Sequence, residues 1–338
     1  MTLTIVLLLT TLALATINGA NDNSKGAATL IGSGLMSTRG AIWMATLATA
    51  AGGLASILLA QGLLAAFSGK GIVPDSLTVS VPFLIAVAGA ATATVGLATM
   101  ASLPISTTHA LFGGLVGAGL VHDAGGVQFA KAAAIIVVPL LLSPLMAAVL
   151  ALVVAPLLRR TAHAPAASRV ARSDGPIESL ATPPLRSLRG IDLLHVLSAA
   201  VVGFARGLND TPKIAALLVA AGLGGVAGAS SSVVIAMAIG GWLGAHRVAK
   251  TLAWRVTAMD PREGLAGNLV TSTLVIAASR FGLPVSTTHV STGALFGIGL
   301  SNGKANFRII AMILLAWGVT LPTSAMIAAL LHFLLPSV

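Results

Sequence analysis

Long apolar stretches alternate along this chain with short glycine-rich stretches that carry most of the polar motifs. The apolar segments lie at 2–20, 41–66, 79–102, 130–158, 191–205, 230–250, 265–281 and 306–335. Seven of the eight reach the length of at least about 17 residues that crosses a bilayer core as a helix. The shorter segments lie near 24–36, 104–121, 212–228 and 284–300. Their length and glycine content predict half-helices or discontinuous helices.

The composition places most of the chain in lipid. Hydrophobic residues make up 56% of it and charged residues 8%, whereas a soluble domain carries about 25% charged residues. An open sheet is excluded because its unpaired backbone groups have no partner in lipid. The continuous apolar runs also lack the alternation of a transmembrane barrel. The chain is therefore predicted to be an all-α, polytopic membrane helix bundle.

The charge pattern indicates topology rather than nucleic-acid binding. The net charge is +10, but aromatic residues are only 4% and no basic helix is visible. Arginines and prolines concentrate at 159–190, which predicts a cytoplasmic linker. The absence of cysteine excludes disulfides and thiolate metal sites. Residues 1–18 lack a basic start and precede a polar pair, so they are expected to form a membrane helix rather than a signal peptide.

Two motifs occur twice in the chain. Gly-Ala-Asn-Asp at 19–22 recurs as Gly-Leu-Asn-Asp at 207–210, an offset of 188 residues. Residues 103–120 align without gaps to 283–300, with identity at 11 of 18 positions and an offset of 180. Because the two offsets are nearly equal, the pattern indicates an internal duplication.

The duplication predicts how the chain is organised. We expect a first transmembrane repeat at 1–158, a basic linker at 159–190 and a second transmembrane repeat at 191–338. If each repeat crosses the membrane an odd number of times, the two have inverted topology. Their discontinuous helices then meet at a site near the midplane.

The Pro-x-Ser-Thr-Thr-His segments at 104–109 and 284–289 predict an anion site. Proline suits the first turn of a helix because its missing N–H would be unpaired there. The following hydroxyls add donors to a helix start that carries about half a positive charge. Two such starts facing each other could surround a tetrahedral oxyanion. The alternative, which the duplication disfavours, is that the hydroxyls only pack helices or bond to their own backbone.

The Asn-Asp pairs form a second candidate site; they are Asn21, Asp22, Asn209 and Asp210. An ionisable side chain inside the membrane costs roughly 2.5–3.5 kcal/mol, so it needs a compensating role. Amide and carboxylate oxygens are hard ligands that suit a small cation. The pairs therefore predict a cation site. The alternative is a helix break at which the aspartate caps the next segment.

Four further residues flank these motifs; they are Lys25, Lys213, His109 and His289. Each lysine follows its aspartate by three residues, and it could neutralise that carboxylate, attract an anion or replace one cation. A plain ion pair is favoured. For the histidines, a structural hydrogen bond is favoured over a proton relay. All four are expected to modulate the site.

With these motifs in order, the sequence resembles the inorganic phosphate transporter (PiT) family, whose members share a duplicated Gly-x-Asn-Asp motif and Pro-x-Ser-Thr-Thr-His segments. The resemblance covers essentially the whole chain and implies symport of phosphate with sodium or protons. It also implies that phosphate is bound by Ser106, Thr107, Thr108, Ser286, Thr287 and Thr288. The cation, sodium if transport is sodium-coupled, would be held by Asn21, Asp22, Asn209 and Asp210.

The sequence also departs from the family pattern. Relatives often have a small or apolar residue where Lys25 stands and histidine where Arg206 stands. A positive charge beside each aspartate puts a sodium site in doubt. It makes proton coupling, or another oxyanion such as sulfate, more credible.

Transport by symport is therefore the expected function, with sulfate as the alternative substrate. An intramembrane hydrolase needs one asymmetric nucleophile–base pair, whereas every candidate here occurs twice. A passive anion channel has little need for paired Asn-Asp motifs. We expect no enzyme activity, no cofactor other than the co-transported Na⁺ or H⁺, and no nucleic-acid partner. The expected location is a bacterial cytoplasmic membrane, and the sequence also allows a homodimer.

Overall fold

The structure is a computed structural model that describes residues 1–160 and 190–335. Within these ranges the regular elements are helices, and the β pairing is an isolated bridge between Lys70 and Val73. In the described part of the chain, seven helices are long and apolar enough to cross a membrane. The predicted all-helical membrane bundle is therefore confirmed. The linker predicted at 159–190 lies almost entirely outside the described residues.

The first half of the chain contains six helices of the bundle and several short elements. The long helices and half-helices are α1 (Thr2–Asp22), α2 (Ser24–Gly32), α3 (Thr38–Leu59), α6 (Val81–Met100), α7 (Thr107–His122) and α9 (Val138–Arg160). The short elements are α4 (Gln61–Ala66), α5 (Asp75–Thr78), α8 (Phe129–Ala132) and a π-helical turn at Ala133–Val137. The break between α1 and α2 is only Asn23, whose backbone stays helical at φ −64° and ψ −19°.

The second half repeats this order. Its helices are α10 (Ile191–Ala220), α11 (Val226–Gly244), α12 (His246–Lys250), α13 (Pro261–Arg280), α14 (Thr287–Asn302) and α15 (Phe307–Leu334). A π-helical stretch at Thr251–Val256 follows α12. Like α6, α13 has twenty residues, and it begins 180 positions after α6 begins. The sequence offset therefore continues into the secondary structure.

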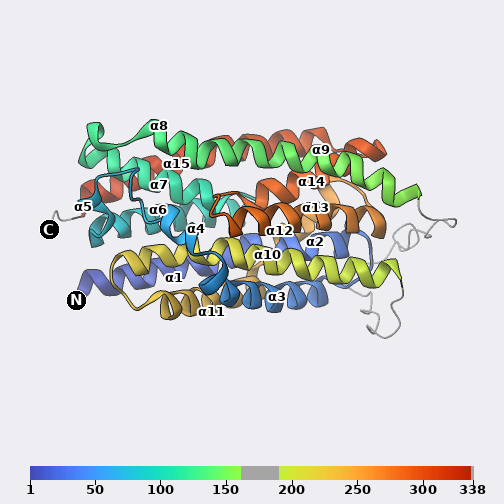
Figure 1. Cartoon of the computed structure of the whole chain (residues 1–338), viewed down its shortest axis with the longest axis horizontal. Coiled ribbons are helices and arrows are strands. Elements are labelled where there is room, and N and C mark those ends of the chain that lie inside the picture. The colour runs from blue at the N-terminus through green and yellow to red at the C-terminus, as the bar shows by residue number, and fades with distance from the viewer. Residues whose placement is uncertain (161–189, 336–338) are drawn as a thin grey trace.

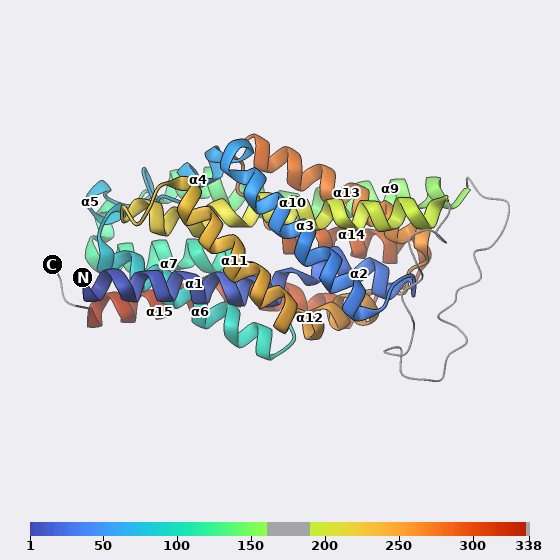
Figure 2. The same cartoon turned by 90° about the horizontal axis from the view of Figure 1, so that it is seen from below.

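The long helices lie along the long axis of the molecule, and the two halves run in opposite directions (Figure 1). Helix α1 starts at the end that carries both termini, whereas α10 starts at the opposite end, where α9 stops; we call this second end the linker end. Helices α9 and α15 are related in the same way (Figures 1 and 2). This antiparallel relation is the inverted topology that the duplication predicted.

Each half completes its packing on the other half. Helix α3 packs on α10, and the corresponding helix α11 packs on α1. In the same way α9 packs on α14, and α15 packs on α7. The halves are therefore interleaved, and neither buries its apolar faces alone.

The structure corrects one predicted element. Residues 212–228 were expected to form a half-helix separate from 191–205, but α10 runs without a break from Ile191 to Ala220 and contains Pro212. Proline is tolerated inside membrane helices where neighbouring groups compensate for the lost backbone hydrogen bond. The predicted half-helices at 104–121 and 284–300 correspond to α7 and α14. Each has sixteen residues, about 24 Å of helix, which is shorter than the hydrocarbon core of about 30 Å.

Candidate functional site

The N-termini of α7 and α14 meet in the middle of the bundle, and the two helices extend to opposite ends (Figure 2). The Thr108 hydroxyl donates to the Val285 carbonyl at 3.4 Å, and the Thr288 hydroxyl donates to the Ile105 carbonyl at 2.6 Å. Each Ser-Thr-Thr motif therefore bonds to the backbone just before the other. The convergence expected from the duplication is present.

The serines of these motifs cap their own helices. Ser106 accepts a hydrogen bond from the His109 backbone N–H at 3.1 Å, and Ser286 accepts one from His289 at 3.3 Å. This is the backbone role considered as an alternative. Both hydroxyls therefore already have a structural partner, and their role as phosphate ligands stays a prediction.

Thr107 and Thr287 accept hydrogen bonds from buried side chains of α1 and α2. The Asn18 amide donates to Thr107 at 2.9 Å. The Lys25 ammonium donates to Thr287 at 2.9 Å. Thr287 also lies 3.5 Å from an Asp210 carboxylate oxygen. The threonines and the carboxylates thus belong to one connected network.

Both predicted aspartates are paired with basic side chains. The Lys25 Nζ lies 2.7 Å from Asp22 Oδ1. Asp210 lies 3.4 Å from the Arg206 Nε and 3.5 Å from the Lys213 Nζ. All five side chains are buried. The ion pair favoured for each lysine is therefore present.

The asparagines of the Asn-Asp pairs hold neighbouring helices. Asn21 donates to Thr99 and to the Leu103 carbonyl, each at 3.0 Å, and accepts from the Ile105 N–H at 3.3 Å. Asn209 donates to Ser279 at 2.9 Å. Asn21 therefore fixes the segment that leads into α7. The predicted cation-ligand role of Asn21 and Asn209 stays untested.

Lys213 reaches further into the site than Lys25. Its Nζ lies 2.9 Å from Thr108 Oγ1 and 2.7 Å from the Val285 carbonyl, and it also donates to Asn209 Oδ1. Lys25 and Lys213 are 3% and 1% exposed. Each therefore contacts a Ser-Thr-Thr motif of the opposite half.

Arg206 and Asn18 belong to this network, although the motifs alone did not place them in it. The Arg206 guanidinium donates to the Asn18 carbonyl at 3.1 Å and to the Asn18 side chain. Asn18 also donates to Asp22 at 3.2 Å. Positions 18 and 206 correspond through the offset of 188, and both precede an aspartate by four residues. That helical spacing was the pattern that could have identified them.

The buried network has an excess of positive charge. Its ionisable groups among the described residues are three basic side chains, Lys25, Arg206 and Lys213, and two aspartates, Asp22 and Asp210. With all of them ionised, one positive charge is left over. Two helix N-termini add further positive potential at the same place. The arrangement suits an anion.

The histidines that end the motifs stack beside the site. The rings of His109 and His289 lie 4.6 Å apart, and His289 stacks on Trp317 at 3.7 Å. The Nδ1 of His289 lies 3.2 Å from the Leu140 carbonyl, the kind of structural hydrogen bond that was expected. Trp317 in turn donates to the Pro104 carbonyl at 3.2 Å. This stack therefore supports the start of α7.

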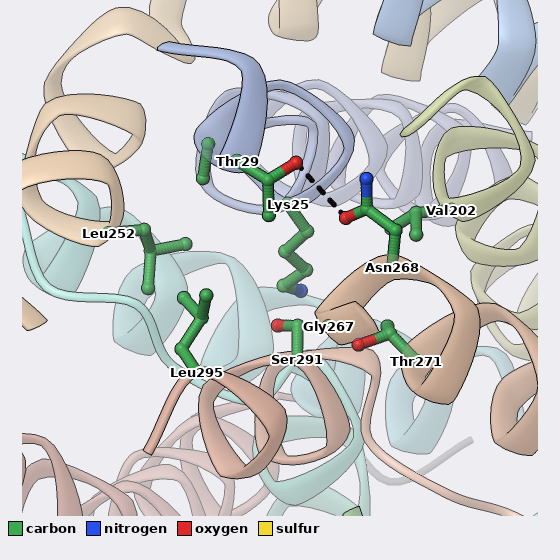
Figure 3. A pocket seen from close by; sticks show the side chains of 10 residues that line it. Lys25, Thr29, Val202, Leu252, Gly267, Asn268, Thr271, Ser291 and Leu295 are labelled. Atoms are coloured by element: carbon green, nitrogen blue, oxygen red, sulfur yellow. Dashed lines mark hydrogen bonds between the residues drawn. The ribbon is translucent and has the colours of Figure 1, made fainter. Parts of the chain in front are cut away.

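A small cavity lies next to Lys25 (Figure 3). Its lining includes Ser291 and Leu295, which follow Thr287 along α14 toward the linker end (Figure 2). It holds about 10 Å³, room for about one water molecule. Thr29 and Asn268 hydrogen-bond at 3.0 Å on its wall. The Lys25 side chain points toward Ser291 of α14. A phosphate ion needs more space than this conformation offers.

The arrangement does not fit a resident metal ion. No group of three or more His, Asp or Glu side chains that could hold a metal is found in residues 1–160 and 190–335. The carboxylates proposed for sodium already face ammonium or guanidinium groups. Their oxygens are therefore committed to the protein's own cations.

Comparisons with known proteins agree with this geometry. The profile described as "Phosphate transporter family" matches residues 18–328. A "Probable low-affinity inorganic phosphate transporter" of Mycobacterium bovis is 28% identical over 98% of this chain and 78% of its own length. The chloroplastic "Inorganic phosphate transporter 2-1" of Arabidopsis thaliana is 25% identical over 92% of this chain and 68% of its own. A solved structure of a sodium-dependent phosphate transporter has a TM-score of 0.82 at 22% identity, covering 98% of both chains.

Proposed function

The chain belongs to the phosphate transporter family, and we propose that it imports inorganic phosphate by symport with a cation. The family is one of transporters rather than enzymes. The observation that carries the proposal is the meeting of the α7 and α14 starts, where threonine hydroxyls and two lysines converge. A tetrahedral anion suits this combination of hydroxyl donors and positive charge.

Phosphate would replace bonds that the protein now makes within itself. The proposed ligands are Ser106, Thr107, Thr108, Ser286, Thr287 and Thr288. Thr108 and Thr288 now donate across the site to the backbone of the opposite half. A bound anion would take over these donors and separate the two motifs. Binding would thereby change how the two halves contact each other.

The coupling argument is electrical. Moving one negative charge inward against about 100 mV, inside negative, costs about 2.3 kcal/mol. A phosphate dianion needs two co-transported cations to travel neutrally. The residues proposed to couple the cation to the anion are Asn21, Asp22, Asn209 and Asp210. The coupling ion would be Na⁺ or H⁺.

We further propose alternating access about this shared site, with repeats at 1–158 and 191–338 rocking against each other. The antiparallel course of α1 and α10 supports such a movement. The proposed location is a bacterial cytoplasmic membrane, with 159–190 on the cytoplasmic side because of its arginines. A homodimer stays a prediction.

The test is uptake of radiolabelled phosphate into proteoliposomes, with sulfate assayed in parallel. Accumulation above electrochemical equilibrium is expected for phosphate, and a passive channel would not produce it. The double variant Thr107→Val/Thr287→Val should lower kcat/KM at least about tenfold, since a hydrogen bond to a charged group is worth about 1.5–3 kcal/mol. Accumulation of sulfate alone would establish the alternative substrate. Phosphate accumulation that survives Asp22→Asn/Asp210→Asn would contradict the coupling role.

A further inference from the structure

We propose that Lys25 and Lys213 are built-in cations that take the place of co-transported sodium, so that this chain binds its oxyanion without sodium. The inference rests on the proposed function and narrows it. The surroundings of Asp22 and Asp210 do not fit a sodium site, because basic side chains already face both carboxylates.

The surroundings of the Lys213 ammonium group resemble the binding site of a metal cation. The Nζ of Lys213 is surrounded by a carbonyl at 2.7 Å from Val285, a hydroxyl at 2.9 Å from Thr108, a carboxylate at 3.5 Å from Asp210 and the amide oxygen of Asn209. Carbonyl, amide and carboxylate oxygens are the ligands of a hard metal cation. Here a lysine ammonium occupies their centre.

Lys25 has the corresponding place in the first half. Its Nζ lies 2.7 Å from Asp22 and 2.9 Å from the Thr287 hydroxyl. The two lysines are separated by the offset of 188 that relates the two Asn-Asp motifs. Each half therefore supplies one fixed cation beside its own aspartate and next to the other half's threonines.

Charge repulsion excludes sodium from the same places. A sodium ion about 4 Å from either ammonium would be repelled by about 4 kcal/mol at an effective dielectric constant of about 20. The network already carries one excess positive charge, contributed by Arg206. An oxyanion reduces that excess, whereas sodium would increase it. If a cation is co-transported, this leaves the proton.

The experiment measures phosphate binding and uptake with sodium or choline as the only other cation. For the unaltered protein, the Kd of inorganic phosphate from titration calorimetry should change by less than about twofold between the two salts, since an ion that does not bind has no linkage to the anion. Proteoliposome uptake should be equally independent of sodium. Sodium-dependent binding would overturn the inference, whereas absence of any phosphate accumulation would count against the proposed function instead.

Variants of the two lysines give a second readout. Lys25→Ala/Lys213→Ala leaves room for an ion beside each aspartate, so phosphate binding should be lost in choline and restored at least partly by sodium. Lys25→Met/Lys213→Met fills the same space without charge, and sodium should not restore it. Lys131→Ala, at an exposed lysine of α8, is the control and should bind as the unaltered protein does. Equal phosphate binding by the alanine and methionine variants in sodium would contradict the role of the two lysines as built-in cations.

The cavity beside Lys25 carries a second, independent inference, because the space related to it by the duplication has no such polar lining. Its polar wall consists of Thr29, Asn268, Thr271 and Ser291, with Leu252 and Leu295 among its apolar neighbours. Through the offsets of 188 and 180, the four polar positions correspond to Leu217, Ala88, Ala91 and Leu111. Those four residues are buried in the apolar core between α6, α7 and α10.

The geometry points to the space between α2, α13 and α14 as the route by which the anion passes between the central site and the linker end. A hydrated anion needs hydrogen-bonding partners along its way, and burying it without them is costly. Asn268 continues the polar strip by donating to Ser198 at 3.1 Å. The corresponding space between α6, α7 and α10 has apolar residues at these four positions, and they are packed into the core.

The natural absence of cysteine allows a direct test. Ser291→Cys and Leu111→Cys are matched through the duplication, and each is treated from the linker side with a membrane-impermeant thiol reagent. Ser291→Cys should react, and saturating phosphate should slow its labelling, whereas Leu111→Cys should stay unlabelled. Equal labelling of both positions, or labelling of Leu111→Cys alone, would overturn the route. Uptake by each unlabelled variant shows that it is folded.

Discussion

At the scale of single residues, close helix crossings depend on glycines that have no room for a side chain. A Cβ at Gly240 would contact the Thr16 carbonyl oxygen of α1, and a Cβ at Gly52 would contact the Phe204 carbonyl oxygen of α10. These two positions correspond through the offset of 188. Small residues of this kind let membrane helices approach closely. The interleaving of the two halves depends on them.

We expect Gly240→Ala to destabilise the protein by about 1–3 kcal/mol, the usual cost of overpacking. Gly228→Ala lies in the same helix, with nothing within 4 Å of its added Cβ. It should be neutral or stabilising by up to about 1 kcal/mol, because alanine favours helix. Thermal unfolding of both purified variants in detergent checks the difference. Equal melting temperatures would contradict the close crossing.

A second residue-scale feature is the left-handed turn before each half-helix. Ser102 has φ +59°, and the corresponding residue of the second half, Gly282, has φ +68°. A left-handed conformation costs a residue with a Cβ about 1–2 kcal/mol. We therefore expect Ser102→Gly to raise the melting temperature and Gly282→Ser to lower it. Shifts of the same sign in the two variants would be inconsistent with this backbone geometry.

At the scale of elements, α13 begins with a capping box. Asp260 accepts from the backbone N–H groups of Arg262 at 2.8 Å and Glu263 at 2.9 Å, and Glu263 accepts from the Asp260 N–H at 2.9 Å. Glu263 also lies 3.4 Å from Arg159 at the end of α9. The box therefore fixes both the start of α13 and its contact with α9.

We expect Asp260→Ala to cost about 0.5–2 kcal/mol of stability, the usual effect of removing an N-cap. Glu263→Gln is the matched comparison, since glutamine can also complete a capping box. It loses the charge that faces Arg159 and the acceptor for the Asn302 amide, two contacts that are partly exposed. Glu263→Gln should therefore lose less stability than Asp260→Ala, and thermal unfolding of the two variants measures this difference. A larger loss in Glu263→Gln would show that the ion pair outweighs the cap.

At the scale of the whole molecule, the two termini share one end and the α9–α10 junction lies at the other (Figure 1). Helix α8, which contains Lys131, lies toward the terminal end, and the segment between α14 and α15, which contains Lys304, lies at the linker end. Both lysines are exposed. With the arginine-rich segment inside, Lys131→Cys should react with an impermeant thiol reagent on intact cells. Lys304→Cys should react only after permeabilisation. The reverse pattern would contradict the proposed orientation.

The limits of sequence reasoning are clearest at Pro212 and at the lysines. The short, glycine-rich stretch at 212–228 predicted a separate half-helix, yet α10 continues through Pro212 to Ala220, as membrane helices can where neighbouring groups satisfy the freed backbone. Three roles for Lys25 and Lys213 were consistent with the motifs. Choosing among these roles requires knowing which oxygen atoms surround each lysine ammonium group. Some of these oxygens belong to Thr287 and Val285, which are distant from the lysines in sequence.

The sequence by itself determined the membrane environment, the duplication and the four motifs, because composition, apolar run length and repeated spacing are properties of the linear chain. It also indicated that two hydroxyl-lined helix starts would meet. Only the tertiary structure decided which half's lysine contacts which half's threonine, that Arg206 bonds to Asn18 across the two halves, and that one of the two corresponding spaces is polar. The reason is that apolar periodicity shows which face of a helix is buried, whereas its neighbours are selected by the packing of all the helices together.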